Sequence, residues 1–262
     1  MSTDLVSRAK ALTKRAADIA AGVKSSASQQ AASQAAKQSG RIMFGVDATA
    51  SRKDCWNQTK VLQADMFFTV QKAGANLAVQ LSYYYGSTFA ASAWLKDASD
   101  LAHVMSQVQC VTGNTQIEKL FDHTLAEHKK NRVGALIFVG DSCEEQEQTL
   151  MYKARGLKAN NIRLFVFHDE MTLSGRFDFS VSRNVNTGSI FRAVTQAAGG
   201  EYAAFDLTSP DVLQDYLKTV AVYSTGNRNE LLRLPPKTES GRRFLNNVLR
   251  LPPPNNCGPS FS

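Results

Sequence analysis

A continuous apolar run, GALIFVG at residues 134–140, limits the fold of this 262-residue chain more than any other feature. Similar runs occupy residues 162–168 (IRLFVFH) and 41–46 (RIMFGV). Such runs are typical of parallel strands whose two faces are both covered. Segments with helical spacing of apolar residues lie between them, so strand and helix alternate. This alternation predicts an α/β fold of Rossmann-like type, a doubly wound, mostly parallel sheet flanked by helices.

The rest of the pattern gives the expected order of elements. Strands are expected at residues 41–46, 76–85, 134–140, 162–168 and 201–206, with a short edge strand at 88–95. Helices are expected at residues 55–70, 98–109, 115–131, 144–159, 189–198 and 210–223. The helix at 189–198 ends at Gly199 and Gly200, a typical stop signal.

Charge divides the chain into three parts. An Ala/Ser/Gln-rich arm, helical or flexible, covers residues 1–40, the α/β domain covers 41–224, and a basic, proline-containing tail covers 225–262. Each arm has six basic and two acidic residues, a net +4, whereas the domain has 18 basic and 19 acidic residues, a net −1. The near-neutral domain argues against a nucleic-acid-binding face on it. The arms can contact nucleic acid, anionic lipid or an acidic partner, or only keep the chain in solution.

The tail contains a short internal repeat. The sequence LRLPP occurs at residues 232–236 and again at 249–253. Prolines end helices and lack a backbone donor, so a non-globular tail is expected. The two copies are interpreted either as straps that pack across the domain or as docking motifs, and the sequence leaves both readings open.

Composition also bears on location. The four cysteines are scattered without a CxxC pair, which is typical of reduced thiols in the cytosol. No secretory signal and no run of about 20 apolar residues is visible, so neither secretion nor a membrane span is expected. These features predict a cytoplasmic protein.

Oxygen-bearing side chains gather where the predicted strands end. Asp47, Thr49 and Ser51 follow the first strand as Asp-x-Thr-x-Ser, Thr115 precedes a helix, and Asp141 directly follows the strand at 134–140. In a doubly wound sheet, ligands bind outside the carboxyl ends of the strands. Carboxylate and hydroxyl oxygens are hard donors that suit Mg²⁺ or Mn²⁺. The sequence therefore predicts a divalent-metal site.

This set resembles the metal-ion-dependent adhesion site of von Willebrand factor A (vWA) domains. The family pattern is Asp-x-Ser-x-Ser, then a distant Thr and a distant Asp, and Asp47, Ser51, Thr115 and Asp141 match it. Thr49 stands at the first Ser position, where it keeps the hydroxyl and adds a methyl group. The resemblance covers residues 41–224. It implies that the hydroxyls contact the metal directly and that the aspartates often act through water.

The resemblance also implies a function. An intracellular bacterial vWA protein is expected to be a protein-interaction adaptor without enzymatic activity, whose metal completes its shell with an acidic group of the partner. Relatives of this kind often work with AAA+ ATPases, so such an ATPase is one expected partner. Two alternatives remain: an RNA-associated vWA protein that uses its basic arms, and a metal-dependent phosphohydrolase with Asp47 as nucleophile. The second lacks an accompanying general base in the sequence.

Other reactive residues are interpreted as structural. Cys143 lies close to Asp141 in sequence, but no base accompanies it, so no catalytic residue is expected. Glu144, Glu145 and Glu147 are expected in the solvated first turn of a helix. The histidines lack metal-ligand spacing and are expected at surface or packing positions: His103, His123, His128 and His168.

Overall fold

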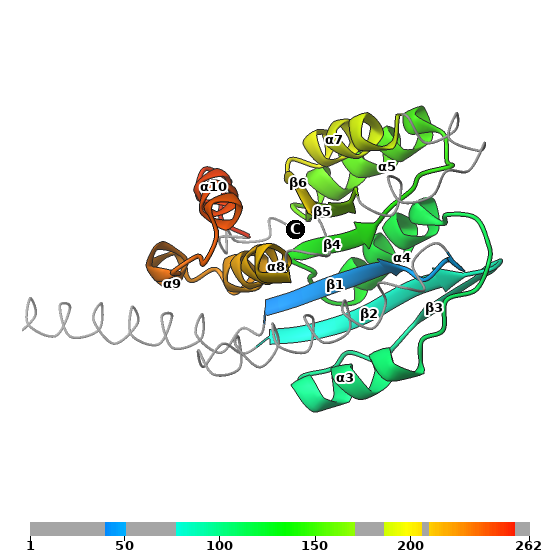
Figure 1. The fold of residues 1–262 in the computed structure, drawn as a ribbon, viewed down its shortest axis with the longest axis horizontal. Helices are drawn as coiled ribbons and strands as arrows, with labels where there is room; N and C mark the ends of the chain where they lie inside the picture. Colours follow the sequence, from blue (N-terminus) through cyan, green and yellow to red (C-terminus); the bar gives the residue numbers. More distant parts are fainter. Residues whose placement is uncertain (1–39, 51–76, 171–185, 206–209, 255–262) are drawn as a thin grey trace, which may run out of the picture. The chain divides into compact units, whose positions relative to one another are not determined.

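A six-stranded sheet forms the centre of the computed structural model, which describes residues 40–50, 77–170, 186–205 and 210–254 (Figure 1). The strands are β1 (Gly40–Asp47), β2 (Leu77–Tyr85), β3 (Thr88–Ala91), β4 (Ala135–Gly140), β5 (Arg163–Asp169) and β6 (Glu201–Phe205). Their order in the sheet is β3-β2-β1-β4-β5-β6. Every neighbouring pair is parallel except β2 and β3. The predicted strands are therefore confirmed, and the edge strand expected at residues 88–95 is shorter, ending at Ala91, and antiparallel.

Helices cover both faces of this sheet (Figure 1). They are α3 (Ala98–Gln107), α4 (Ile117–Lys130), α5 (Glu147–Ala159), α7 (Thr187–Ala197), α8 (Pro210–Ser224), α9 (Arg228–Arg233) and α10 (Glu239–Val248). The helices α4, α5 and α7 share one hydrophobic cluster with one face of the sheet, and α3, α8, α9 and α10 share the other. This confirms the doubly wound α/β fold. The helix expected at residues 55–70 lies outside the described residues.

The all-apolar sequence of β4 follows from its position between the two helical layers. All six residues of β4 are buried. Successive side chains of a strand point to opposite faces, so Leu136 and Phe138 pack in the α4/α5/α7 cluster while Ile137 and Val139 pack in the other.

No helix within the described residues is long and apolar enough to cross a membrane.

The tail differs from the sequence prediction over residues 225–254, because this part folds onto the domain. Helices α9 and α10 contribute four buried side chains to the core that α3 and α8 share, namely Leu231, Phe244, Leu245 and Val248. Helical spacing of these apolar residues allows the segment to bury one face, and the prolines only end the helices. Residues 255–262 lie outside the described part of the chain.

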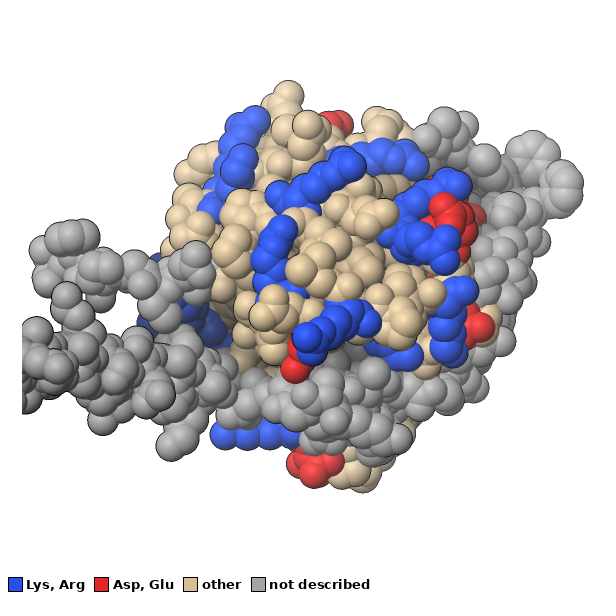
Figure 2. Space-filling view, turned by 90° about the vertical axis from the view of Figure 1, so that its left-hand side faces the viewer, with Lys and Arg blue, Asp and Glu red and all other residues tan. Residues whose placement is uncertain are grey.

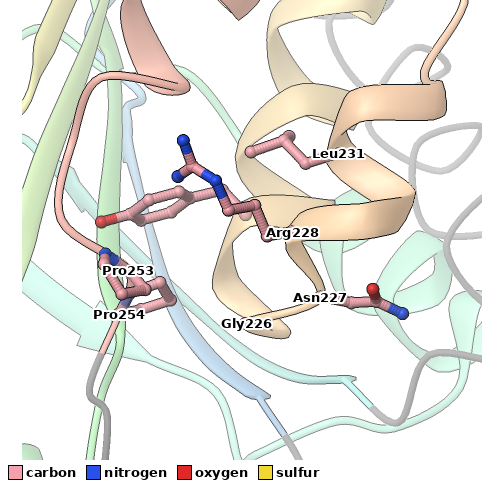
Figure 3. Close-up of a pocket in the computed structure, with 7 residues that line it drawn as sticks. Gly226, Asn227, Arg228, Leu231, Pro253 and Pro254 are labelled. Atoms are coloured by element: carbon pink, nitrogen blue, oxygen red, sulfur yellow. The ribbon is translucent and has the colours of Figure 1, made fainter.

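The second LRLPP copy acts as a strap rather than as a free docking motif. Leu249 and Leu251 pack against the core. The Tyr223 hydroxyl donates to the Pro252 carbonyl at 2.6 Å, and the Arg228 guanidinium donates to the Leu249 carbonyl at 2.9 Å. A small pocket lies between α9 and this strap (Figure 3). The first copy contributes Leu234 to the core edge but leaves Leu232 58% exposed.

A buried carboxylate on α8 fixes the start of α10. Asp215 is 4% exposed and accepts hydrogen bonds from the backbone N–H groups of Lys237 and Thr238 at 3.1 and 2.8 Å. It also accepts from the Thr238 hydroxyl at 2.8 Å. Thr238 in turn caps α10 by accepting from Gly241 N–H. The carboxylate therefore joins the tail to the domain by charge-assisted hydrogen bonds.

Replacing Asp215 with Ala is expected to lower the free energy of unfolding by roughly 1–3 kcal/mol, because a buried carboxylate and the two backbone donors bonded to it lose their interaction. Urea unfolding measures this value. The control is Asp211→Ala, which removes an exposed carboxylate paired with Lys237 at 2.8 Å and is expected to change stability by less than about 1 kcal/mol. Equal effects of the two variants would contradict an anchoring role for Asp215.

Candidate metal centre

The two aspartates of the predicted site come from the central pair of parallel strands. Asp47 is the last residue of β1, and Asp141 directly follows β4. The register pairs Val46 with Val139, so both carboxylates emerge at the carboxyl edge of the sheet. They are 0% and 1% exposed. Gly140, directly before Asp141, leaves room for the Phe138 ring, because a Cβ atom there would lie 2.6 Å from that ring.

The loop after β1 is held in place by backbone pairing. The N–H of Thr49 donates to Asp47 Oδ1 at 2.8 Å, which forms a tight turn over the end of the strand. The N–H of Val111 donates to the Ala48 carbonyl at 3.1 Å and pairs this loop with the segment that leads to Thr115. Thr49 and Thr115 are each 6% exposed. Four of the five predicted ligands thus lie in buried positions of the loops at this edge, and Ser51 lies outside the described residues.

Thr115 is joined to the Asp141 loop by a reciprocal pair of hydrogen bonds. The N–H of Glu144 donates to Thr115 Oγ1 at 3.1 Å, and the N–H of Thr115 donates to a Glu144 carboxylate oxygen at 3.3 Å. These residues are far apart in sequence. The two loops that carry Thr115 and Asp141 therefore form one structural unit.

Glu145 reinforces this unit by capping α4. Its two carboxylate oxygens accept from the N–H groups of Ile117 and Glu118, each at 2.7 Å. The residue at the N-cap position, Gln116, makes no such bond with its side chain. Burial raises the pKa of Glu145, while the two backbone hydrogen bonds oppose that rise. The expected solvated helix turn is therefore corrected: α5 begins at Glu147, and Glu145 belongs to the loop that supports the site.

Tyr84 is a further residue of the site that the sequence reading did not identify. It lies beside Asp47 in the β1–β2 register, is 1% exposed, and stacks on Phe138 with ring centroids 6.4 Å apart. Its hydroxyl has no hydrogen-bond partner among the described residues. Burial, followed by the charges of Asp47, Glu145 and Asp141, raises the pKa of this phenol well above 10. A neutral hydroxyl donor therefore lies within the electrostatic reach of both predicted aspartate ligands.

The donor set fits a hard divalent cation. Two carboxylates removed from water are costly without a compensating positive charge or hydrogen bonds. Within the described residues no group of three or more His, Cys, Asp or Glu could hold a metal. The predicted ligands would supply two carboxylates together with hydroxyl oxygens, and water would complete the shell of an ion. That mixture suits Mg²⁺ or Mn²⁺ and not the nitrogen and sulfur ligands of a zinc site.

Cys143 and His168 lie near this edge but have the properties of packing residues. Burial raises the pKa of the Cys143 thiol to about 12, the opposite of an activated nucleophile. His168 is 3% exposed, its Nδ1 lies 2.8 Å from the Tyr202 hydroxyl, and burial lowers its pKa. Its ring packs edge-on against Phe191. Both observations agree with the structural roles expected from the sequence.

Comparison with known proteins gives a fold but no family. No protein-family model and no curated protein matches the sequence. Among solved structures, the SpRpn10 VWA domain is 13% identical with a TM-score of 0.53, and the match covers 67% of this chain and 95% of that one. An aerotolerance-related membrane protein from Bacteroides fragilis is 14% identical with a TM-score of 0.52, and the match covers 69% and 98%.

A third match is to part of a larger protein. The pilus adhesin SpaC from Lactobacillus rhamnosus GG is 12% identical with a TM-score of 0.56, and the match covers 72% of this chain but only 30% of that one. These identities are too low to transfer a function. Together with the strand order and the helices on both faces, the structural matches show that the chain has a vWA-like fold.

The Glu145 cap is expected to be a main support of the loops at this edge. Replacing Glu145 with Ala leaves the first N–H groups of α4 without an acceptor and is expected to lower the free energy of unfolding by about 1–3 kcal/mol. Chemical denaturation measures the loss. The matched control, Glu147→Ala, removes an acid from the first turn of α5 and is expected to cost no more than about 1 kcal/mol. A Glu145 variant as stable as this control would contradict the capping role.

Proposed function

We propose that this domain binds one divalent cation, Mg²⁺ or Mn²⁺, and uses it to hold a partner protein. The ligands would be Asp47, Thr49, Ser51, Thr115 and Asp141. The observation that carries the proposal is that two buried carboxylates lie at the carboxyl ends of the neighbouring strands β1 and β4. The strands β2 and β3 lie on one side of β1, and β4, β5 and β6 follow on its other side. The strand order therefore reverses between β1 and β4, which is where doubly wound sheets bind ligands. A bound ion would supply an open coordination position for an acidic side chain.

The surrounding chemistry favours binding over catalysis. The Cys143 thiol is not activated, and His168 is buried in a packing role. The carboxylates that follow Asp141, those of Glu144 and Glu145, accept hydrogen bonds from the backbone N–H groups of Thr115, Ile117 and Glu118, so they hold the loops together rather than serve a reacting group. We therefore propose an adaptor without enzymatic activity, working in the cytoplasm, with an AAA+ ATPase as the partner class that the vWA resemblance suggests. SpaC, a pilus adhesin of similar fold, is consistent with an interaction role.

Metal binding is expected to stabilise the folded protein. Free Mg²⁺ at about 100 times its Kd adds about 2.7 kcal/mol, which corresponds to a rise in Tm of roughly 5–10 °C. Thr115→Val removes the hydroxyl at nearly constant volume and is expected to lose most of the rise. Thr115→Ser keeps the hydroxyl and is expected to retain it, and Asp47→Ala is expected to abolish it. Thermal melting with and without chelator measures all four proteins.

No metal-dependent shift in the wild type, or equal shifts in Thr115→Val and Thr115→Ser, would contradict the site. The same pair of variants tests the partner. Immobilised wild type and Thr115→Ser are expected to capture a protein in Mg²⁺ and release it in chelator, whereas Thr115→Val captures none. Capture that persists in chelator would show that the partner binds elsewhere.

The buried Tyr84 hydroxyl is proposed to donate to an oxygen of the filled site. Tyr84→Phe is then expected to have opposite effects on the two states. The metal-free protein is unchanged or slightly more stable, because a buried hydroxyl without a partner is removed. Metal affinity falls by about tenfold, as is typical when a hydrogen bond to a ligand shell is lost. Calorimetric titration with Mn²⁺ and melting in chelator separate the effects, and an unchanged Mn²⁺ affinity would remove Tyr84 from the site.

A further inference from the structure

Basic residues gather at the amino edge of the sheet, opposite the candidate metal centre. The segments that lead into β4 and β5, residues 128–134 and 155–163, contain no acidic residue. Their basic side chains are Lys129, Lys130, Arg132, Arg155, Lys158 and Arg163. Residues 41–224 are nearly neutral overall, but these two segments carry six of their 18 basic residues and none of their acidic ones.

The folded tail adds its own basic residues to this end. The exposed ones are Arg228, Arg233, Lys237, Arg242, Arg243 and Arg250. Figure 2 shows Lys and Arg spread over this side of the molecule with few Asp or Glu among them. We define the basic face by its six exposed side chains that form no ion pair with a described residue: Lys129, Arg132, Lys158, Arg228, Arg233 and Arg250.

Several of these positions lie next to one another. A Cβ atom at Gly199 would lie 2.8 Å from the Arg163 guanidinium and 3.4 Å from Lys158 Cε, so these two side chains meet there. A Cβ atom at Gly134 would lie 3.7 Å from Pro254, which places the strap beside the Arg132 loop. The Arg228 bond to the Leu249 carbonyl joins α9 to the same strap.

The face also presents one large apolar side chain. Leu232 is 58% exposed on α9, one helical turn after Arg228 and next to Arg233. The other large hydrophobic residues exposed in the described part of the chain are Val111, which precedes α4, and Tyr152, which lies within α5. The face therefore combines arginines, which bind phosphate well, with an exposed leucine and without an exposed aromatic ring for stacking on bases.

We propose that the basic face docks on the anionic phosphate headgroups of a phospholipid bilayer, with Leu232 entering the headgroup region. Arginines beside an apolar side chain are typical of protein surfaces that bind at the membrane interface. Nucleic acid would account for the arginines but not for the exposed leucine. Docking in this orientation leaves the opposite edge, with Asp47 and Asp141, turned away from the membrane. The proposal does not depend on the metal site.

Sedimentation of the full chain with vesicles, in chelator and at low salt, tests the proposal. The protein is expected to pellet with phosphatidylcholine vesicles that contain phosphatidylglycerol and not with phosphatidylcholine alone. Each basic residue at an anionic surface contributes about fivefold to binding, so Arg132→Ser with Arg250→Ser is expected to weaken it roughly 30-fold. The matched control, Lys119→Ser with Arg192→Ser, removes the same charge from the opposite edge and is expected to have little effect.

Leu232→Ser distinguishes a bilayer from nucleic acid. Leu232→Ser is expected to weaken vesicle binding several-fold and to leave any binding to an RNA duplex unchanged. The control Val111→Ser is expected to leave vesicle binding unchanged. The proposal is overturned if the chain does not bind anionic vesicles, or if the two double variants bind them equally well. It is also overturned if Leu232→Ser binds vesicles normally while the RNA duplex binds and depends on Arg132 and Arg250. Thermal melting confirms that each variant is folded.

Discussion

The parallel pairing of β1 with β4 is the interaction on which the site depends. It joins two strands that are distant in sequence and sets their carboxyl ends level, so that Asp47 and the residue after Gly140 emerge together. The absence of a side chain at Gly140 leaves room for the Phe138 ring. A shift of one residue in this register would turn β4's side chains to the opposite faces. The core and the site are thus specified by the same pairing.

The loops around this edge are fixed by bonds between chain segments rather than by local turns alone. Glu144 and Glu145 follow Asp141, yet their hydrogen bonds go to Thr115 and to the start of α4. The capping carboxylate also compensates the exposed N–H groups of that helix. These hydrogen bonds hold the two loops together and thereby position Thr115 relative to Asp141. The candidate metal centre and the basic face lie at opposite ends of the strands. This separation allows each of them to hold its proposed ligand at the same time.

Much of the fold could be predicted from the sequence because the central strands β1, β4 and β5 are almost entirely buried. The run at 134–140 predicted β4 within one residue, and reading the strand ends placed Asp47 and Asp141 at one edge. Tyr84 could not be assigned to the site, since its role requires the β1–β2 register. The Glu145 cap joins residues that are nearly thirty positions apart, which no local pattern reveals. The folding of the tail onto the domain was not predicted, because prolines flank the segment that carries the helical spacing of Phe244, Leu245 and Val248. The near-zero net charge of residues 41–224 does not reveal that the segments before β4 and β5 hold basic residues and no acidic ones.

Counting bound Mn²⁺ tests the central claim most directly. In a spectroscopic titration of free Mn²⁺ by electron paramagnetic resonance, the wild type is expected to remove one ion per chain. The variant Asp47→Asn with Asp141→Asn, which keeps the size of both side chains, is expected to remove none. A wild type that leaves the free Mn²⁺ signal unchanged, or a double variant that binds as tightly as the wild type, would contradict the account.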